Sequence, residues 1–131
     1  MAAAILIQIS TGNGRCHSAV NHTTNKKFIL FMDAKLHLEF GAEIALRMMD
    51  MGCAGGQTVA DFMTLRWQGV GMEGSDFSLK HRRANWAQLA NTHLFTGDIT
   101  KPFQITLDGR PTTFHLITAW EGMEHIATPD R

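Results

Sequence analysis

The residues best suited to bind a ligand form one basic run in the middle of the chain. The run reads Lys80-His81-Arg82-Arg83. It stands at the start of a predicted helix, where unpaired N–H groups and the positive end of the helix dipole favour anions. Cations at that position need a negative partner, and a bound phosphate or carboxylate is one candidate. The run therefore predicts an anion-binding site; the alternative is pairing of both arginines with the protein's own carboxylates.

Aromatic and histidine side chains fall beside this run. On a helical wheel, Arg82 and Arg83 flank an apolar stripe that contains Trp86 and His93, and Trp86 lies within stacking reach of Arg82. His37 borders the apolar stripe of an earlier predicted helix. The sequence thus predicts a ligand pocket walled by Arg82, Arg83, Trp86, His93 and His37. The alternative for the two histidines is a core position with one hydrogen-bonded ring nitrogen.

Cysteine supplies a second functional hypothesis. Cys53 lies in a glycine-rich turn just before a predicted helix, where a thiol can have a lowered pKa and act as a nucleophile. A small hydrolase or transferase using Cys53 or a pocket histidine is therefore an alternative to a binding domain. Cys16, His17 and His22 lie close together but match no zinc spacing, so no metal site is predicted. A third hypothesis is a protein-interaction or regulatory module without chemistry, and no motif indicates a particular cofactor.

Composition limits the class of protein. The chain has 131 residues, of which 44% are hydrophobic, and its formal net charge is zero. These values predict one globular domain, and they lack the basic charge typical of nucleic-acid-binding domains. No apolar run approaches the length of a membrane span, and the first residues lack the basic region of a signal peptide. We therefore expect a cytoplasmic protein with no nucleic-acid or membrane partner.

The pattern of elements predicts strands at both ends and helices between them. Alternation over 4–10 and the apolar run 28–32 predict strands, with a weaker strand over 16–21. Helix-favouring residues and cap signals predict helices over 34–51, 59–68 and 79–95, begun by Asp33, Thr58 and Ser78; a break at Gly41 is possible. The last ten residues predict a loose polar tail.

A C-terminal hairpin is the clearest local prediction. The Asp108-Gly109 pair favours a two-residue turn that places Leu107 opposite Arg110. With that register, one face collects apolar side chains, namely Phe103, Ile105, Leu107, Phe114, Leu116 and Trp120. The other face is half polar, and together with zero net charge it predicts a homodimer.

Together these elements predict an α+β domain over 1–131. Its sheet would be mostly antiparallel, with four or five strands from the N-terminal strands and the C-terminal hairpin, and the three central helices would pack on one face. The leading functional hypothesis is a small-molecule-binding domain for an anionic ligand, with its pocket between the sheet and the third helix.

Overall fold

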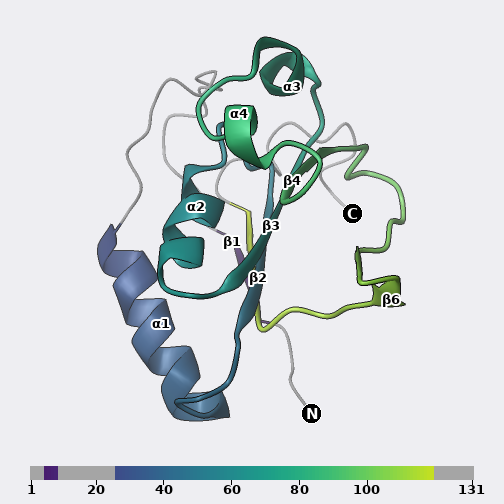
Figure 1. Ribbon diagram of the computed structural model, residues 1–131. Coiled ribbons are helices and arrows are strands. Elements are labelled where there is room, and N and C mark those ends of the chain that lie inside the picture. Colours follow the sequence, from purple (N-terminus) through teal and green to yellow (C-terminus); the bar gives the residue numbers. More distant parts are fainter. Residues whose placement is uncertain (1–4, 9–25, 120–131) are drawn as a thin grey trace.

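The computed structural model describes residues 5–8 and 26–119 (Figure 1). In chain order its elements are β1 (Ile5–Gln8), α1 (Lys26–Phe40), β2 (Arg47–Met51), α2 (Gln57–Thr64), β3 (Gln68–Glu73), α3 (Phe77–His81), α4 (Trp86–Leu89), β4 (Leu94–Thr96), β5 (Thr106–Leu107), β6 (Arg110–Pro111) and β7 (Leu116–Ala119). The predicted strand over 16–21 and the polar tail lie outside the described residues.

The main sheet has five strands in the order β1-β7-β2-β3-β4. Every neighbouring pair is parallel, with Ile5 opposite Leu116 and Met49 opposite both Ile117 and Val70. The predicted antiparallel sheet is therefore wrong. Strands joined by short hairpins pair antiparallel, whereas parallel neighbours need long crossover connections. In this sheet β7 lies between β1 and β2, two strands that come much earlier in the chain.

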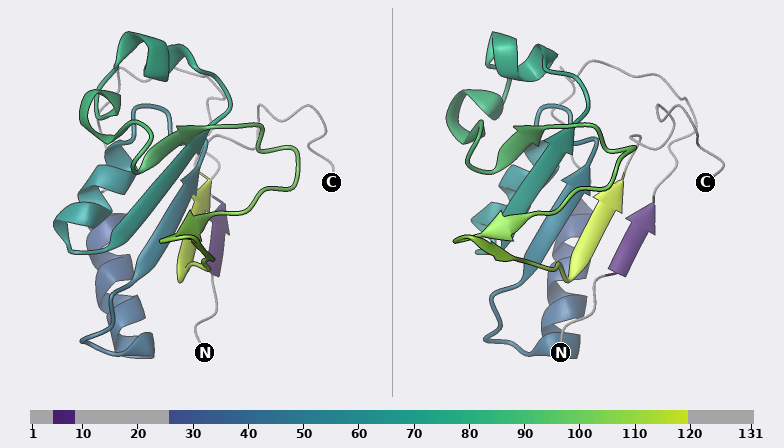
Figure 2. Two further views of the ribbon diagram at one scale, coloured as in Figure 1. Left: turned by 45° about the vertical axis from the view of Figure 1, so that its right-hand side comes forward. Right: turned by 90° about the vertical axis from the view of Figure 1, so that its right-hand side faces the viewer.

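Each face of the sheet is covered by a different layer. Helices α1 and α2 lie on one face, and the segment that carries β5 and β6 lies on the other (Figures 1 and 2). The helix side holds the larger apolar cluster, which includes Leu36 of α1, Phe62 of α2, Trp86 of α4 and Leu116 of β7. The opposite side holds a smaller cluster around Met49, Met72 and Phe114.

Residues 28–32, predicted as a strand, belong to α1. Ile29, Met32 and Leu36 are buried at helical spacing, while Leu30 and Phe31 are exposed. A buried strand would have enclosed consecutive side chains, whereas here the apolar run is divided between a buried and an exposed face of one helix. The prediction failed because a compact apolar run is typical of a buried strand, whereas here the lysines before it and the helix-favouring residues after it belong to the same helix.

The predicted helix over 34–51 is correct only in its first part. α1 ends at Phe40, and Gly41 adopts φ +126° while its N–H donates to the His37 carbonyl at 2.8 Å. This is the break that the sequence allowed at Gly41, because glycine tolerates a positive φ at a helix end. Residues 47–51 form β2 instead, whose central residues are buried on both faces. Such strands lack the alternation that identifies a strand in sequence.

The other two predicted helices also differ from the observed elements in their bounds. The helix predicted over 59–68 is present as α2, although it begins earlier, after Gly56, and Thr58 does not cap it. It also ends earlier, at Thr64, and Gln68 is already the first residue of β3. The helix predicted over 79–95 is wrong as one element: the chain forms α3, α4 and the strand β4.

Gly71 shows how closely β3 packs under the loop after β2, because a Cβ there would lie 2.8 Å from the Cys53 sulfur.

The predicted hairpin is present but does not join the main sheet. β5 and β6 pair antiparallel with Leu107 opposite Arg110, and Asp108 and Gly109 form the turn with positive φ values. The two strands are exposed, and the chain then turns back so that Leu116–Ala119 enters the parallel sheet as β7. The turn chemistry therefore determined the local pairing, and long-range contacts determined where the following strand packs.

Candidate functional site

A cavity lies between the main sheet and the segment that carries the hairpin, and we call it the hairpin cavity. Its volume is about 470 Å³. Strand β3 and the start of β2 supply one wall, and the chain from 103 to 114 supplies another. The lining residues are Arg47, Gln68, Gly69, Val70, Met72, Thr92, His93, Phe95, Phe103, Gln104, Ile105, Thr106, Leu107, Thr112 and Phe114.

The lining is mainly apolar and contains one arginine. Arg47 is the first residue of β2, and alternation along the strand directs its side chain to the hairpin side of the sheet. Its Nε donates to the Thr113 carbonyl at 2.7 Å, and its backbone N–H donates to Nδ1 of His115 at 3.0 Å. The guanidinium is thus anchored to the chain that forms the opposite wall.

His115 lies behind this arginine as a buried core residue. It is 2% exposed and packs edge-on against the Phe40 ring, with 4.9 Å between ring centroids. Burial, together with the positive charge of Arg47, lowers the pKa of His115. Because Nδ1 accepts a hydrogen bond from the Arg47 backbone, the neutral ring carries its proton on Nε2.

The basic run lies at the end of a helix, which corrects the premise of the predicted anion site. Lys80 and His81 occupy the last turn of α3, and Arg82 is its C-terminal cap in the left-handed conformation with φ 48°. Positive charge is favourable at that end of the helix dipole, so these side chains need no bound anion. Lys80 also forms an ion pair with Asp76 at 3.3 Å.

The two predicted arginines point to different surroundings. Arg82 is exposed, whereas Arg83 is half-buried with its guanidinium carbon 5.0 Å from the centroid of the Phe77 ring. The stacking expected between Arg82 and Trp86 is replaced by this contact between Arg83 and Phe77. Trp86 is fully buried, and its indole N–H donates to the Ala54 carbonyl at 2.6 Å.

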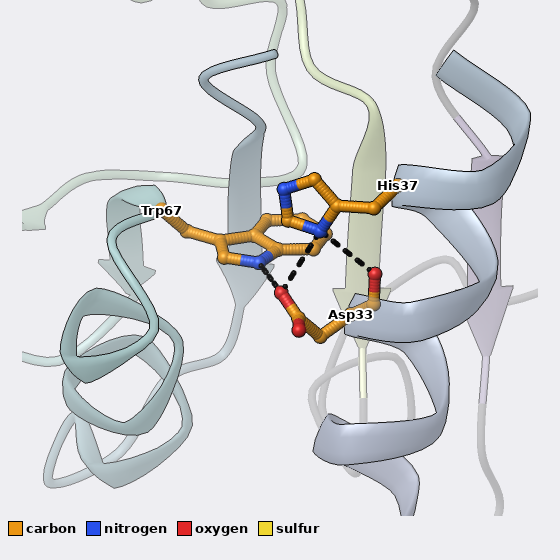
Figure 3. Close-up of polar contacts among 3 residues, drawn as sticks. All are labelled: Asp33, His37 and Trp67. Carbon is orange, nitrogen blue, oxygen red and sulfur yellow. Dashed lines mark hydrogen bonds and ion pairs between the residues drawn. The ribbon is translucent and has the colours of Figure 1, made fainter. Parts of the chain in front are cut away.

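His37 belongs to a polar cluster between α1 and the end of α2. Figure 3 shows the side chains of His37 and Trp67 both pointing toward Asp33. Trp67 Nε1 donates to the Asp33 carboxylate at 2.7 Å, and His37 Nδ1 lies 2.9 Å from the Asp33 carbonyl and 3.2 Å from its carboxylate. These contacts join α1 to the turn before β3, which is a structural role for a partly buried histidine.

Of the five predicted ligand-binding residues, His93 lines the hairpin cavity. The other four, Arg82, Arg83, Trp86 and His37, are not part of its lining. Arg47 falls within the helix predicted over 34–51, so the sequence does not place it in the predicted site. The sequence feature that could have indicated a strand here is the methionine-rich run that begins at Arg47 and ends before Gly52.

A second polar group lies at the carboxyl end of β2. Asp50 is 2% exposed, and its carboxylate accepts a hydrogen bond from Thr118 Oγ1 of β7 at 2.7 Å. Burial raises the pKa of Asp50 from 3.8 to about 7, and the Glu73 carboxylate adds to this rise. The carboxyl ends of parallel strands are common ligand sites, but Asp50 is not among the residues that line the hairpin cavity.

Cys53 lies next to this group and does not have the environment of an activated thiol. It is buried, and desolvation together with the Asp50 and Glu73 carboxylates raises its pKa well above the usual value. The lowered pKa that the sequence suggested is therefore contradicted. Among the described residues no three histidine, cysteine or acidic side chains are placed to hold a metal ion, and Cys16, His17 and His22 lie outside them.

Comparisons of the chain with models of protein families, with curated proteins and with solved structures found no match. Within the part of the chain that the structure describes, no helix is long and apolar enough to span a bilayer.

Proposed function

We propose that this protein is a small-molecule-binding domain whose ligand occupies the hairpin cavity. The observation that carries the proposal is the cavity itself: about 470 Å³, lined mainly by apolar side chains with a few polar groups. Ligand sites in proteins have this size and this mixture of apolar walls and sparse polar contacts. The expected anionic ligand is retained in this proposal, but its site moves from the basic run at residues 80–83 to the cavity.

The walls of the cavity support binding without a large rearrangement. Val70 and Met72 belong to β3, which is paired on both sides within the sheet. Phe114 is 6% exposed and packs in the smaller apolar cluster with Met72. A ligand that fills a preformed site loses less free energy to ordering of the protein than one that must create its site.

The experiment uses a neutral apolar fluorophore, N-phenyl-1-naphthylamine, whose emission rises when it leaves water. We expect saturable binding to the wild-type protein and a loss of at least about tenfold in affinity for Val70→Phe, because the larger ring occupies the cavity. The matched control is Leu38→Phe, an enlargement at an exposed position of α1. Equal binding by Val70→Phe and wild type, or no saturable binding at all, would contradict the proposal.

A further inference from the structure

We infer that the ligand of the hairpin cavity is an apolar molecule with a single carboxylate, such as a medium-chain fatty acid or an arylalkanoic acid, held by the Arg47 guanidinium. This inference rests on the proposed function and specifies its ligand. It assigns a role to a residue whose contacts are otherwise structural.

The first argument is charge. The cavity lining includes Arg47 and contains no aspartate or glutamate. Among the described residues, the ion pairs join Asp33 to His37, Asp76 to Lys80 and Asp98 to Lys101, and none involves Arg47. Arg47 is half-buried as a residue, the hydrogen bond of its guanidinium is exposed to solvent, and the cavity lining supplies no carboxylate, so a carboxylate from outside the protein can pair with it.

The second argument is geometry. A guanidinium has five N–H donors, and the Thr113 carbonyl engages the one on Nε. That bond fixes the plane of the group and leaves the Nη donors for a second partner. A carboxylate matches two parallel N–H donors, and an anchored arginine loses less side-chain entropy on binding it than a freely rotating one.

The third argument separates a carboxylate from a phosphate. Phosphate sites combine several positive charges or a helix N-terminus, whereas this cavity has one arginine and is bordered by strands and loops. Gln68 is the direct neighbour of Arg47 across β2 and β3, so its side-chain amide can supply a neutral donor near the anionic group. Met72, Phe95 and Phe114 then provide surface for an apolar body.

The test is displacement of the bound fluorophore by three molecules of matched chain length: decanoate, decanol and decylamine. We expect decanoate to displace the probe at about tenfold lower concentration than decanol, and decylamine to be the weakest, because only the carboxylate pairs with Arg47. In Arg47→Gln the decanoate affinity should fall about ten- to a hundredfold while the decanol affinity changes less than about threefold.

Decanol binding by Arg47→Gln also serves as the control for folding of that variant. Arg82→Gln removes an exposed arginine outside the cavity and should leave both affinities unchanged. If decanoate and decanol bind equally to the wild type, or if Arg47→Gln binds decanoate normally, the cavity binds ligands but the carboxylate assignment is wrong. If neither molecule binds and the fluorophore does not bind either, the proposed function fails as well.

Discussion

Arg47 and Asp50 lie three residues apart in β2, and strand alternation directs their side chains to opposite faces of the sheet. Arg47 reaches a cavity, where its charge has space for a partner. Asp50 is enclosed under the helix layer, with one hydrogen bond from Thr118. The same short strand therefore carries one ionised group suited to binding and one whose charge is costly to the fold.

The cost of the Asp50 charge makes stability depend on pH. Its pKa is raised from 3.8 to about 7 in the folded state, so the folded protein binds this proton more tightly than the unfolded chain. The contribution of Asp50 to stability therefore improves as pH falls from about 8 to 4. Asp50→Asn removes the charge at all pH values, so the variant should be more stable than the wild type at pH 8. The upper limit of this gain is about 4 kcal/mol, from roughly three pKa units at 1.36 kcal/mol each.

Urea unfolding of both proteins at pH 5, 6, 7 and 8 measures this effect. The difference in unfolding free energy should shrink toward pH 5, where the wild-type carboxyl is protonated. His115 acts in the opposite direction, because its lowered pKa makes the fold less stable as pH falls below about 6.5. Subtracting the variant from the wild type cancels that contribution. A difference that stays constant from pH 5 to pH 8 would show that Asp50 is ionised throughout.

At the scale of elements, α1 is the helix whose sequence was only partly sufficient to predict it. Residues 34–40 alternate as a strand would, with Leu36 and Leu38 on the same side. In the helix these two residues face opposite directions: Leu36 is fully buried, and Leu38 is 88% exposed. Composition correctly favoured a helix here, and its true beginning at Lys26 was missed because the preceding apolar run resembled a buried strand.

A pair of truncations distinguishes the two patterns. Leu36→Ala should lower the unfolding free energy by about 2–5 kcal/mol, because it leaves a cavity beneath α1. Leu38→Ala should change it by less than about 0.5 kcal/mol, since the side chain is in water. Chemical denaturation of the two variants at one pH is sufficient. Similar losses for both would mean that the strand-like pattern describes the buried face of this segment.

The other elements fall into two groups: those determined by residues close together in the sequence, which could be predicted, and those determined by long-range packing, which could not. The Asp108-Gly109 turn and helix α2 were predictable, because turn residues and a 3.6-residue apolar period act over short distances. Strand β2 was not predictable, since it is buried on both faces and rich in methionine, so it shows no alternation. Strand β4 has three residues at an edge of the sheet, too few to show a period of two. The candidate site could not be predicted for the same reason, because Arg47 lines the cavity only if residues 47–51 form a strand.

At the scale of the whole molecule, the sheet separates two apolar clusters that depend on the same strands. The helix-side cluster includes Met48 and Val59, and the hairpin-side cluster includes Met49 and Met72. Since Met48 and Met49 are neighbours in β2, losing either cluster removes support from the same strand. A single domain over the chain stays a prediction, and so does the homodimer.

Cooperative unfolding tests the single-domain prediction. Val59→Ala on the helix side and Met72→Ala on the hairpin side should each shift one shared thermal transition to lower temperature, because both destabilise the same folded unit. The transition is followed by far-UV circular dichroism and by tryptophan fluorescence, and the two curves should coincide for each variant. Two separate transitions, or a shift seen by one probe alone, would indicate that the two layers unfold independently.

The pairing of β1 with β7 has a consequence for how the protein is made. Residues 5–8 are synthesised before the strand they join, residues 116–119, which follows more than a hundred residues later. At about 5–20 residues per second the nascent chain spends several seconds or more with β1 unpaired and one edge of β2 open. Chaperones that shield unpaired strands during translation would therefore act on this chain mainly before β7 emerges.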